Sequence, residues 1–296
     1  MNGILCVNKP AGFTSFDVIA KLRGILKIRR LGHGGTLDPM ATGVLPVFVG
    51  TATKACDIMP DSTKSYLAGF RLGSVSDTQD IWGQVRVSSD MAVGYDELEA
   101  VLPCFRGTIM QLPPMYSAVQ VNGQRLYDLA RKGIEVEREP REAEISALNI
   151  VDYDPETREG HLEIVCGKGT YIRTIINDIG EKLGCGGIMT SLVRTSSGGF
   201  RLEECRSLEE IQQAADEGKT EELILPIERV FASMKRLTLN EAQTRMYRNG
   251  VKLDIGRVRG VLPDCDEYAV YGTDGFIGLA ETDRENGIIR VRKNLS

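Results

Sequence analysis

Hydrophobic and polar residues alternate along the segment 64–72, where every second residue from Tyr66 to Leu72 is apolar. A period of two residues is typical of a strand with one buried face, so the pattern predicts a strand whose Tyr66 side chain points into the core. Shorter apolar runs between turn residues predict further strands. These lie at residues 4–7, 44–49, 115–121, 145–151, 162–165 and 188–195.

Apolar residues at intervals of three and four positions predict helices. The first helix follows Thr14, which can form a capping box with Asp17 three residues later, and residues 18–26 supply its apolar side. Weaker patterns predict two further helices, at 95–105 and 208–215.

Another helix opens after the segment 167–170 and ends at Gly184. Arg173 falls in its first turn, where a cation opposes the helix dipole. The placement therefore requires a reason, such as a carboxylate that faces the guanidinium.

Glycine and polar residues predict the connections between these elements. Residues 30–35 contain three glycines and are interpreted as a mobile loop. Residues 73–83 form a polar loop, and Asn122-Gly123 is a strong hairpin signal that ends the strand at 115–121.

The pattern changes between residues 225 and 235, which predicts a domain boundary there. A short helix at 240–247 and strands at 268–271, 276–281 and 288–292 have the rhythm of a small β-barrel. We therefore expect an α+β protein, in which a mixed, mainly antiparallel sheet flanked by helices (residues 1–230) precedes a small β-rich domain (residues 231–296).

The length of 296 residues and a hydrophobic content of 42% allow one large core and a smaller satellite. No apolar stretch approaches the roughly 20 residues needed to span a bilayer. The first residues lack the apolar core of a signal peptide, so a cytoplasmic protein is expected.

Seven cysteines form an odd, scattered set with no Cys-x-x-Cys pair, and only two histidines accompany them. We expect reduced, mostly buried thiols and no metal site.

The net charge of −5 argues against indiscriminate coating of nucleic acid. The charge is unevenly distributed, however, because residues 1–54 carry seven basic and only two acidic side chains. That surplus suits local capture of a polyanion, although a solvated helix face would produce the same count.

Asp38 lies between the glycine-rich segment and the apolar run at 44–49, and Pro39 follows it. A carboxylate on such rigid backbone can act as a nucleophile. Taken alone, the spacing favours the interpretation that Asp38 is an ordinary turn residue, since Asp-Pro is common at the entry of a turn.

Several motifs together resemble the TruB-type tRNA pseudouridine synthases, over roughly residues 1–200. In family order, the motifs are 8–15 (NKPAGFTS), 30–45 (RLGHGGTLDPMATGVL), 64–66 (KSY), 113–119 (PPMYSAV) with Asn122-Gly123 and 125–127 (RLY), and 166–174 (CGKGTYIRT).

The resemblance implies a pseudouridine synthase fold and isomerisation of a T-loop uridine of tRNA, conventionally uridine 55, with Asp38 as the catalytic carboxylate. The glycosidic N1–C1′ bond breaks and the uracil rejoins the sugar through C5. Attack on the sugar and removal of a sugar proton remain alternative routes for Asp38. No redox or group-transfer step occurs, so the resemblance implies no cofactor.

The resemblance also implies that Arg173 pairs with Asp38. It implies that Tyr66 stacks on the uracil and could assist proton removal from C5. Without the resemblance, Arg173 could be a surface arginine and Tyr66 an ordinary core residue.

The remaining implied residues surround the substrate. His33, beside Arg29 and Arg30, would fill the space vacated in the T loop by the extruded base. Asp80 would support the site geometry, and Leu192 would form an apolar wall opposite Tyr66. Two residues would support the cleft structurally, Lys9 and Pro10.

The resemblance further implies that residues 231–296 form a PUA-like RNA-binding domain, in which Arg290, Arg292 and Lys293 could touch the acceptor stem. The T arm of tRNA is the expected partner, with no protein partner and a monomeric chain.

Two alternatives stay open. A non-catalytic RNA-binding or tRNA-folding module would share this architecture. An aspartate-nucleophile phosphotransferase or a glycosidase would need a metal-binding acidic cluster or a carboxylate pair, for which Asp77 and Asp80 are candidates.

Overall fold

The computed structural model describes residues 1–117, 119–121 and 123–296. Within these residues, nine strands form one large sheet. The spatial order along its main path is β1 (Gly3–Lys9), β3 (Thr42–Val49), β12 (Gly187–Ser197), β4 (Lys64–Leu72), β11 (Glu159–Cys166), β10 (Arg141–Asp154) and β7 (Gly107–Gln111). Two short strands extend it, β2 (Leu31–His33) beside β3 and β13 (Phe200–Arg201) beside β12.

Nearly all neighbouring strands of this sheet are antiparallel, and the exception joins its two halves. Strands β12 and β3 run parallel and pair at two positions, Val193 with Thr42 and Arg194 with Gly43. The predicted α+β class, with a mixed, mainly antiparallel sheet flanked by helices, is confirmed.

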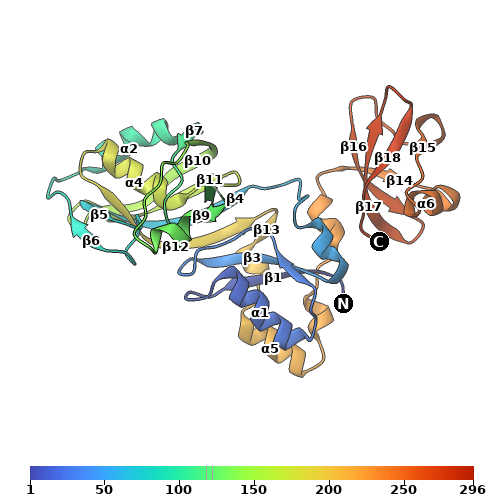
Figure 1. Cartoon of the computed structure of the whole chain (residues 1–296), viewed down its shortest axis with the longest axis horizontal. Coiled ribbons are helices and arrows are strands. Elements are labelled where there is room, and N and C mark those ends of the chain that lie inside the picture. The colour runs from blue at the N-terminus through green and yellow to red at the C-terminus, as the bar shows by residue number, and fades with distance from the viewer. Residues whose placement is uncertain (118, 122) are drawn as a thin grey trace.

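Helices cover the two halves of the sheet separately (Figure 1). One half packs against α1 (Ser15–Leu26) and α5 (Leu208–Asp216). The other packs against α2 (Tyr95–Val101) and α4 (Ile172–Lys182). Each half therefore has its own hydrophobic core, and the parallel contact of β3 with β12 lies between them.

The helix ends follow local chemistry. The predicted capping box of α1 is present, with Asp17 N–H donating to Thr14 Oγ1 and Thr14 N–H donating to Asp17. Helix α4 has no capping side chain of its own. Instead, the buried Gln111 of β7 accepts from Tyr171 N–H at 2.8 Å and donates to Tyr171 O at 2.9 Å. The sheet thus fixes the start of the helix that carries Arg173.

Strand β4 matches its predicted bounds, and Tyr66 is buried as expected. The predicted helix at 95–105 is a helix only to Val101 and then a 3₁₀ turn, because Pro103 cannot donate the next helical hydrogen bond.

Two connecting segments differ from expectation. The segment predicted as a loop at 73–83 begins with β5 (Ser74–Ser76), which pairs with β6 (Val85–Val87). Within the described residues of the predicted strand at 115–121, only β8 (Gln120–Val121) is a strand. It pairs with β9 (Gln124–Arg125), and α3 (Leu126–Ala130) follows. Ala118 of that predicted strand and Asn122 of the predicted turn lie outside the described residues.

A second, five-stranded sheet forms within the described residues of the C-terminal region, and in Figure 1 it stands apart from the large sheet. Its members are β14 (Lys235–Thr238), β16 (Glu267–Gly272), β17 (Gly275–Asp283), β18 (Ile288–Asn294) and β15 (Leu253–Asp254), with α6 (Glu241–Arg248) beside them. Arg290 and Arg292, which the resemblance suggested could touch the acceptor stem, form ion pairs with Asp283 and Glu267.

All seven cysteines are unpaired and four of them are buried, as predicted. In the described part of the chain, no helix has both the length and the apolar character needed to cross a membrane.

Candidate active site

Asp38 projects from the connection between β2 and β3, and both of its neighbours are anchored. Leu37 N–H donates to the Ser15 hydroxyl at 2.9 Å, and Pro39 O accepts from Gly12 N–H at 2.9 Å. The Asp38 side chain itself is 47% exposed. Its backbone is therefore fixed while its carboxylate stays open to a ligand.

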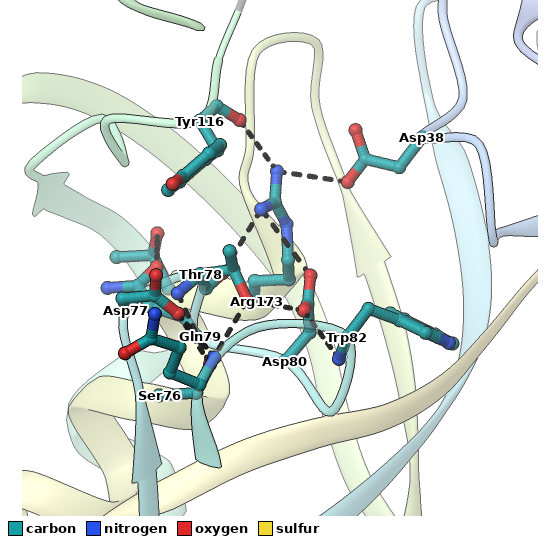
Figure 2. Close-up of polar contacts among 11 residues, drawn as sticks. Asp38, Ser76, Asp77, Thr78, Gln79, Asp80, Trp82, Tyr116 and Arg173 are labelled. Carbon is teal, nitrogen blue, oxygen red and sulfur yellow. Dashed lines mark hydrogen bonds and ion pairs between the residues drawn. The ribbon is translucent and has the colours of Figure 1, made fainter. Parts of the chain in front are cut away.

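Arg173 faces two carboxylates, which accounts for a cation in the first turn of α4 (Figure 2). Its Nη2 lies 3.0 Å from Asp38 Oδ2, and its Nη1 lies 3.6 Å from Asp80 Oδ2. The guanidinium also donates to the carbonyls of Thr78, at 3.1 Å, and Tyr116, at 3.0 Å. The side chain is only 7% exposed. Two carbonyl acceptors and two carboxylate partners hold Arg173 in one orientation and give Asp38 a fixed partner.

Tyr66 and Leu192 belong to adjacent strands, β4 and β12, and line the same cavity as Asp38 and Arg173. The cavity measures about 330 Å³ and is also lined by Tyr116 and by the segment from Gly167 to Ile172. Burial raises the pKa of Tyr66 to about 12, against the opposing charge of Arg194. Tyr66 is therefore a neutral phenol at neutral pH.

Asp80 contacts the cavity-lining residues through Arg173, and residues of its own loop hold its side chain. Its Oδ1 accepts from the Thr78 hydroxyl at 2.5 Å and from Trp82 N–H at 3.1 Å. A backbone bridge to Met189 of β12 fixes the same residue from the other side. Asp80 thus ties the 76–83 loop to the guanidinium that contacts Asp38.

Lys9 is fully buried at the end of β1, and its ammonium donates to three carbonyls: Pro10 at 2.9 Å, Phe13 at 2.5 Å and Pro39 at 2.9 Å. Burial lowers the pKa of Lys9 to about 8, and the nearby Asp38 carboxylate opposes that shift. The residue after Asp38 is therefore tied to the first strand of the sheet.

Arg194 was not singled out from the sequence, yet no atom of it reaches solvent. It donates to Val44 O at 2.7 Å, Gly35 O at 3.2 Å and Thr36 O at 3.3 Å, and it stands opposite Tyr66 on the neighbouring strand. Among the described residues, no carboxylate forms an ion pair with it. A buried cation in an apolar strand is the only sequence signal that could have drawn attention to it.

Gly43 allows this arrangement. Its φ is +101°, and a Cβ there would stand 2.2 Å from Arg194 O, so β3 and β12 can approach only with glycine at this position.

His33 does not lie on a loop as predicted: it belongs to β2 and pairs with Val47 of β3. Backbone hydrogen bonding to the edge of β3 explains the difference, since the glycines around His33 leave that pairing sterically free. The ring is half-buried, and burial together with Arg194 lowers the pKa of His33. Arg29 and Arg30 are exposed nearby.

The structure therefore brings Asp38, Tyr66, Arg173 and Leu192 together around one cavity, with Asp80 in contact through Arg173. Lys9 is linked to the Asp38 turn by its hydrogen bond to Pro39 O. His33, Arg29 and Arg30 are not among the residues that line this cavity.

Comparison with known families assigns most of the chain. A model of the TruB family pseudouridylate synthase N-terminal domain matches residues 23–172. A model of the tRNA pseudouridylate synthase B C-terminal domain matches residues 173–232.

Curated relatives match along nearly their whole length. The tRNA pseudouridine synthase B of Clostridium tetani is 41% identical over 286 residues, covering 96% of this chain and 97% of that protein. The protein of the same name from Syntrophomonas wolfei is 44% identical over 285 residues, covering 93% of this chain and 95% of that protein.

Two solved structures share the fold. A chain in the crystal structure of a Cbf5-Nop10-Gar1 complex superimposes with a TM-score of 0.77 at 25% identity, covering 99% of this chain and 85% of that chain. A chain in the structure of an H/ACA RNP bound to a substrate RNA containing 2′-deoxyuridine gives a TM-score of 0.75 at 23% identity, with the same coverages.

Proposed function

The chain belongs to the TruB family of tRNA pseudouridine synthases, and on that premise we propose that it converts uridine 55 in the T loop of tRNA to pseudouridine, with Asp38 as the catalytic carboxylate. The observation that carries the proposal is the Asp38 carboxylate itself. It is half exposed, paired with Arg173 at 3.0 Å, and opens on the cavity that Tyr66 and Leu192 line.

The cavity suits one extruded nucleotide. A uridine stacked inside an RNA stem-loop cannot enter a cavity beside this carboxylate without leaving its stack, which costs a few kcal/mol. Tyr66 offers a ring face to the uracil, and Leu192 offers an apolar wall. These contacts offset part of that cost.

Asp38 acts on the nucleotide so that the N1–C1′ bond breaks and a C5–C1′ bond forms. The C5 proton leaves and N1 gains a proton, so the reaction is an isomerisation without change of oxidation state. Attack on C1′ and removal of a sugar proton are both compatible with a half-exposed carboxylate. Arg173 orients that carboxylate in either case.

Tyr66 acts mainly through its ring. Because its pKa is about 12, its phenolate is rare at neutral pH, and a role as a ready general base is disfavoured. We propose that Tyr66 stacks on the uracil and supplies a neutral hydroxyl at the edge of the cavity.

Outside the cavity, Arg29 and Arg30 are proposed to contact phosphates of the T arm. His33 would fill the space left by the extruded base, from a paired strand rather than from a mobile loop. Asp80, Lys9 and Pro10 would preserve the geometry around Asp38 without touching the RNA.

For the whole chain, we propose a catalytic domain at residues 1–230 and a PUA-like RNA-binding domain at residues 231–296. We also propose that the chain acts as a monomer without a protein partner, in the cytoplasm. The complexes named for the two solved structures describe those proteins.

The direct test incubates the protein with an unmodified tRNA transcript and maps pseudouridine by mass spectrometry. We expect one pseudouridine, at position 55, and none in a transcript that carries cytidine there. A transcript whose nucleoside composition stays unchanged would favour a non-catalytic RNA-binding module. A product at another position would contradict the proposed site.

A further inference from the structure

Trp82 is the only tryptophan of the chain, and it lies beside the candidate active site without being part of the core. Its side chain is 41% exposed although it is large and apolar. Single exposed apolar residues are common on protein surfaces and need no explanation by themselves. What distinguishes Trp82 is how firmly its loop is held and to which residues.

The loop that carries Trp82 is fixed from several sides. Gln84 N–H donates to Asp77 Oδ1 at 2.7 Å, which closes the loop on itself. Ile81 N–H donates to Met189 O at 3.0 Å and Met189 N–H donates to Gln79 O at 3.1 Å, which attaches the loop to β12.

Gly83 shows how tightly the chain passes over this turn. A Cβ at that position would stand 2.2 Å from Thr78 Oγ1 and 2.3 Å from Asp77 Oδ1. A side chain at position 83 would displace these two groups, so glycine lets the chain after Trp82 pass close to the side chains of Thr78 and Asp77.

Trp82 is connected to the catalytic carboxylate by three consecutive contacts. Its N–H donates to Asp80 at 3.1 Å, Asp80 lies 3.6 Å from Arg173, and Arg173 lies 3.0 Å from Asp38. Figure 2 shows the indole extending away from Asp80, on the same side of Arg173 as Asp38 in that view. The backbone of an exposed tryptophan is thus held in a fixed position relative to Asp38.

We infer that Trp82 is a stacking surface for an unpaired RNA base next to the extruded uridine. The inference rests on the proposed function, because it needs an RNA whose target base has left its stack. Extrusion exposes the faces of the neighbouring bases, and an aromatic ring stabilises such a face whatever the base is. Since the loop is already rigid, little ordering entropy opposes the contact.

The single tryptophan makes this inference directly measurable. Stacking on a nucleobase quenches indole fluorescence, and every photon of tryptophan emission from this chain comes from Trp82. The wild-type protein is titrated with a T-arm hairpin RNA, and binding is followed in parallel by the anisotropy of a dye on the RNA. We expect quenching that saturates at the same RNA concentration as the anisotropy.

Abasic hairpins identify the base. Two hairpins each lack the base on one side of the target uridine. We expect the emission to recover with one of them and to stay quenched with the other. If neither abasic hairpin restores the emission, Trp82 does not stack on a neighbour of the target.

Substitutions test the energetic contribution. Trp82→Leu keeps an apolar side chain but removes the flat ring, and it should weaken hairpin binding about tenfold, whereas Trp82→Phe should stay within about threefold of wild type. Val151→Ala, at an exposed apolar position on β10, is the matched control and should bind as wild type does.

The outcomes separate this inference from the proposed function. Two outcomes overturn the stacking role and leave the enzymatic proposal intact. In the first, hairpin is bound and its uridine is converted to pseudouridine without any change in tryptophan emission. In the second, the Trp82→Leu variant binds the hairpin as tightly as wild type does. Bound hairpin that quenches the emission but yields no pseudouridine supports the stacking role and overturns the enzymatic proposal.

Discussion

Replacing Arg173 with methionine should damage stability and activity through two different carboxylates. Methionine keeps much of the side-chain length but removes the charge and all donors. Asp80, 11% exposed, would lose its cation, and removing one partner of a buried pair typically costs about 3–5 kcal/mol. Asp80 keeps its bonds from Thr78 and Trp82, which favours the lower end of that range.

The other contributions are smaller. Two backbone carbonyls, of Thr78 and Tyr116, would lose a donor, at about 1 kcal/mol each. Asp38 is 47% exposed, so water screens the loss of its partner, which adds at most about 1 kcal/mol. The free energy of unfolding should therefore fall by about 5–6 kcal/mol in total.

A double-mutant cycle measured by urea unfolding isolates the Asp80 contribution. Asp80→Asn should destabilise the wild-type protein, where it breaks an ion pair. In the Arg173→Met background it should stabilise the protein, by about 2 kcal/mol, because it removes an unpaired buried charge.

Activity should not follow stability in this cycle. Tritium release from tRNA containing 5-tritiated uridine should stay about a hundredfold below wild type in both Arg173→Met and the double variant, since Asp38 lacks its partner in each. If Asp80→Asn has the same effect on unfolding in both backgrounds, or if the double variant regains activity, the reasoning about Arg173 is wrong.

Three further residues give predictions that are simpler to check. Arg194→Lys keeps a cation but supplies fewer donors to the carbonyls of Val44, Gly35 and Thr36. We expect kcat to fall about tenfold while KM changes little. An unchanged kcat would refute a role of Arg194 in positioning the site. Tyr66→Phe keeps the ring and should bind T-arm RNA within about threefold of wild type, whereas Tyr66→Leu should bind about tenfold more weakly; equal binding by both would refute stacking. Lys9 has a pKa of about 8 in the folded protein and 10.5 ordinarily. Between these two pH values the unfolded chain binds more protons than the folded chain. The free energy of unfolding should therefore rise as the pH rises from about 8 to 10.5, by at most about 3 kcal/mol. Urea unfolding of Lys9→Met should lack this rise, and a rise that persists would show that another group causes it.

Local patterns predicted those parts of the fold that local chemistry decides. The alternation in 64–72 predicted β4 and the burial of Tyr66, and Thr14 with Asp17 predicted the start of α1. The position of Arg173 in a first turn, where a cation is unfavourable, indicated a carboxylate partner, and the structure contains two.

Long-range contacts decide the features that the sequence did not reveal. Nothing near Tyr116 in the sequence indicates that its carbonyl accepts from Arg173. In the described part of the predicted strand at 115–121, which follows two prolines, strand forms only at residues 120–121. Arg194 acts on carbonyls about 150 residues away, which no local pattern can show. Glycines beside His33 suggested a loop, but the edge of β3 pairs with that segment.

The central claim is that the carboxylate of residue 38 carries the chemistry, and Asp38→Asn tests it most directly. Asparagine has the same shape and can still accept from Arg173, so tRNA binding should stay within about threefold of wild type. Tritium release from 5-tritiated uridine in tRNA should fall to the level of the buffer. Tritium release at the wild-type rate from the Asp38→Asn variant would contradict the account.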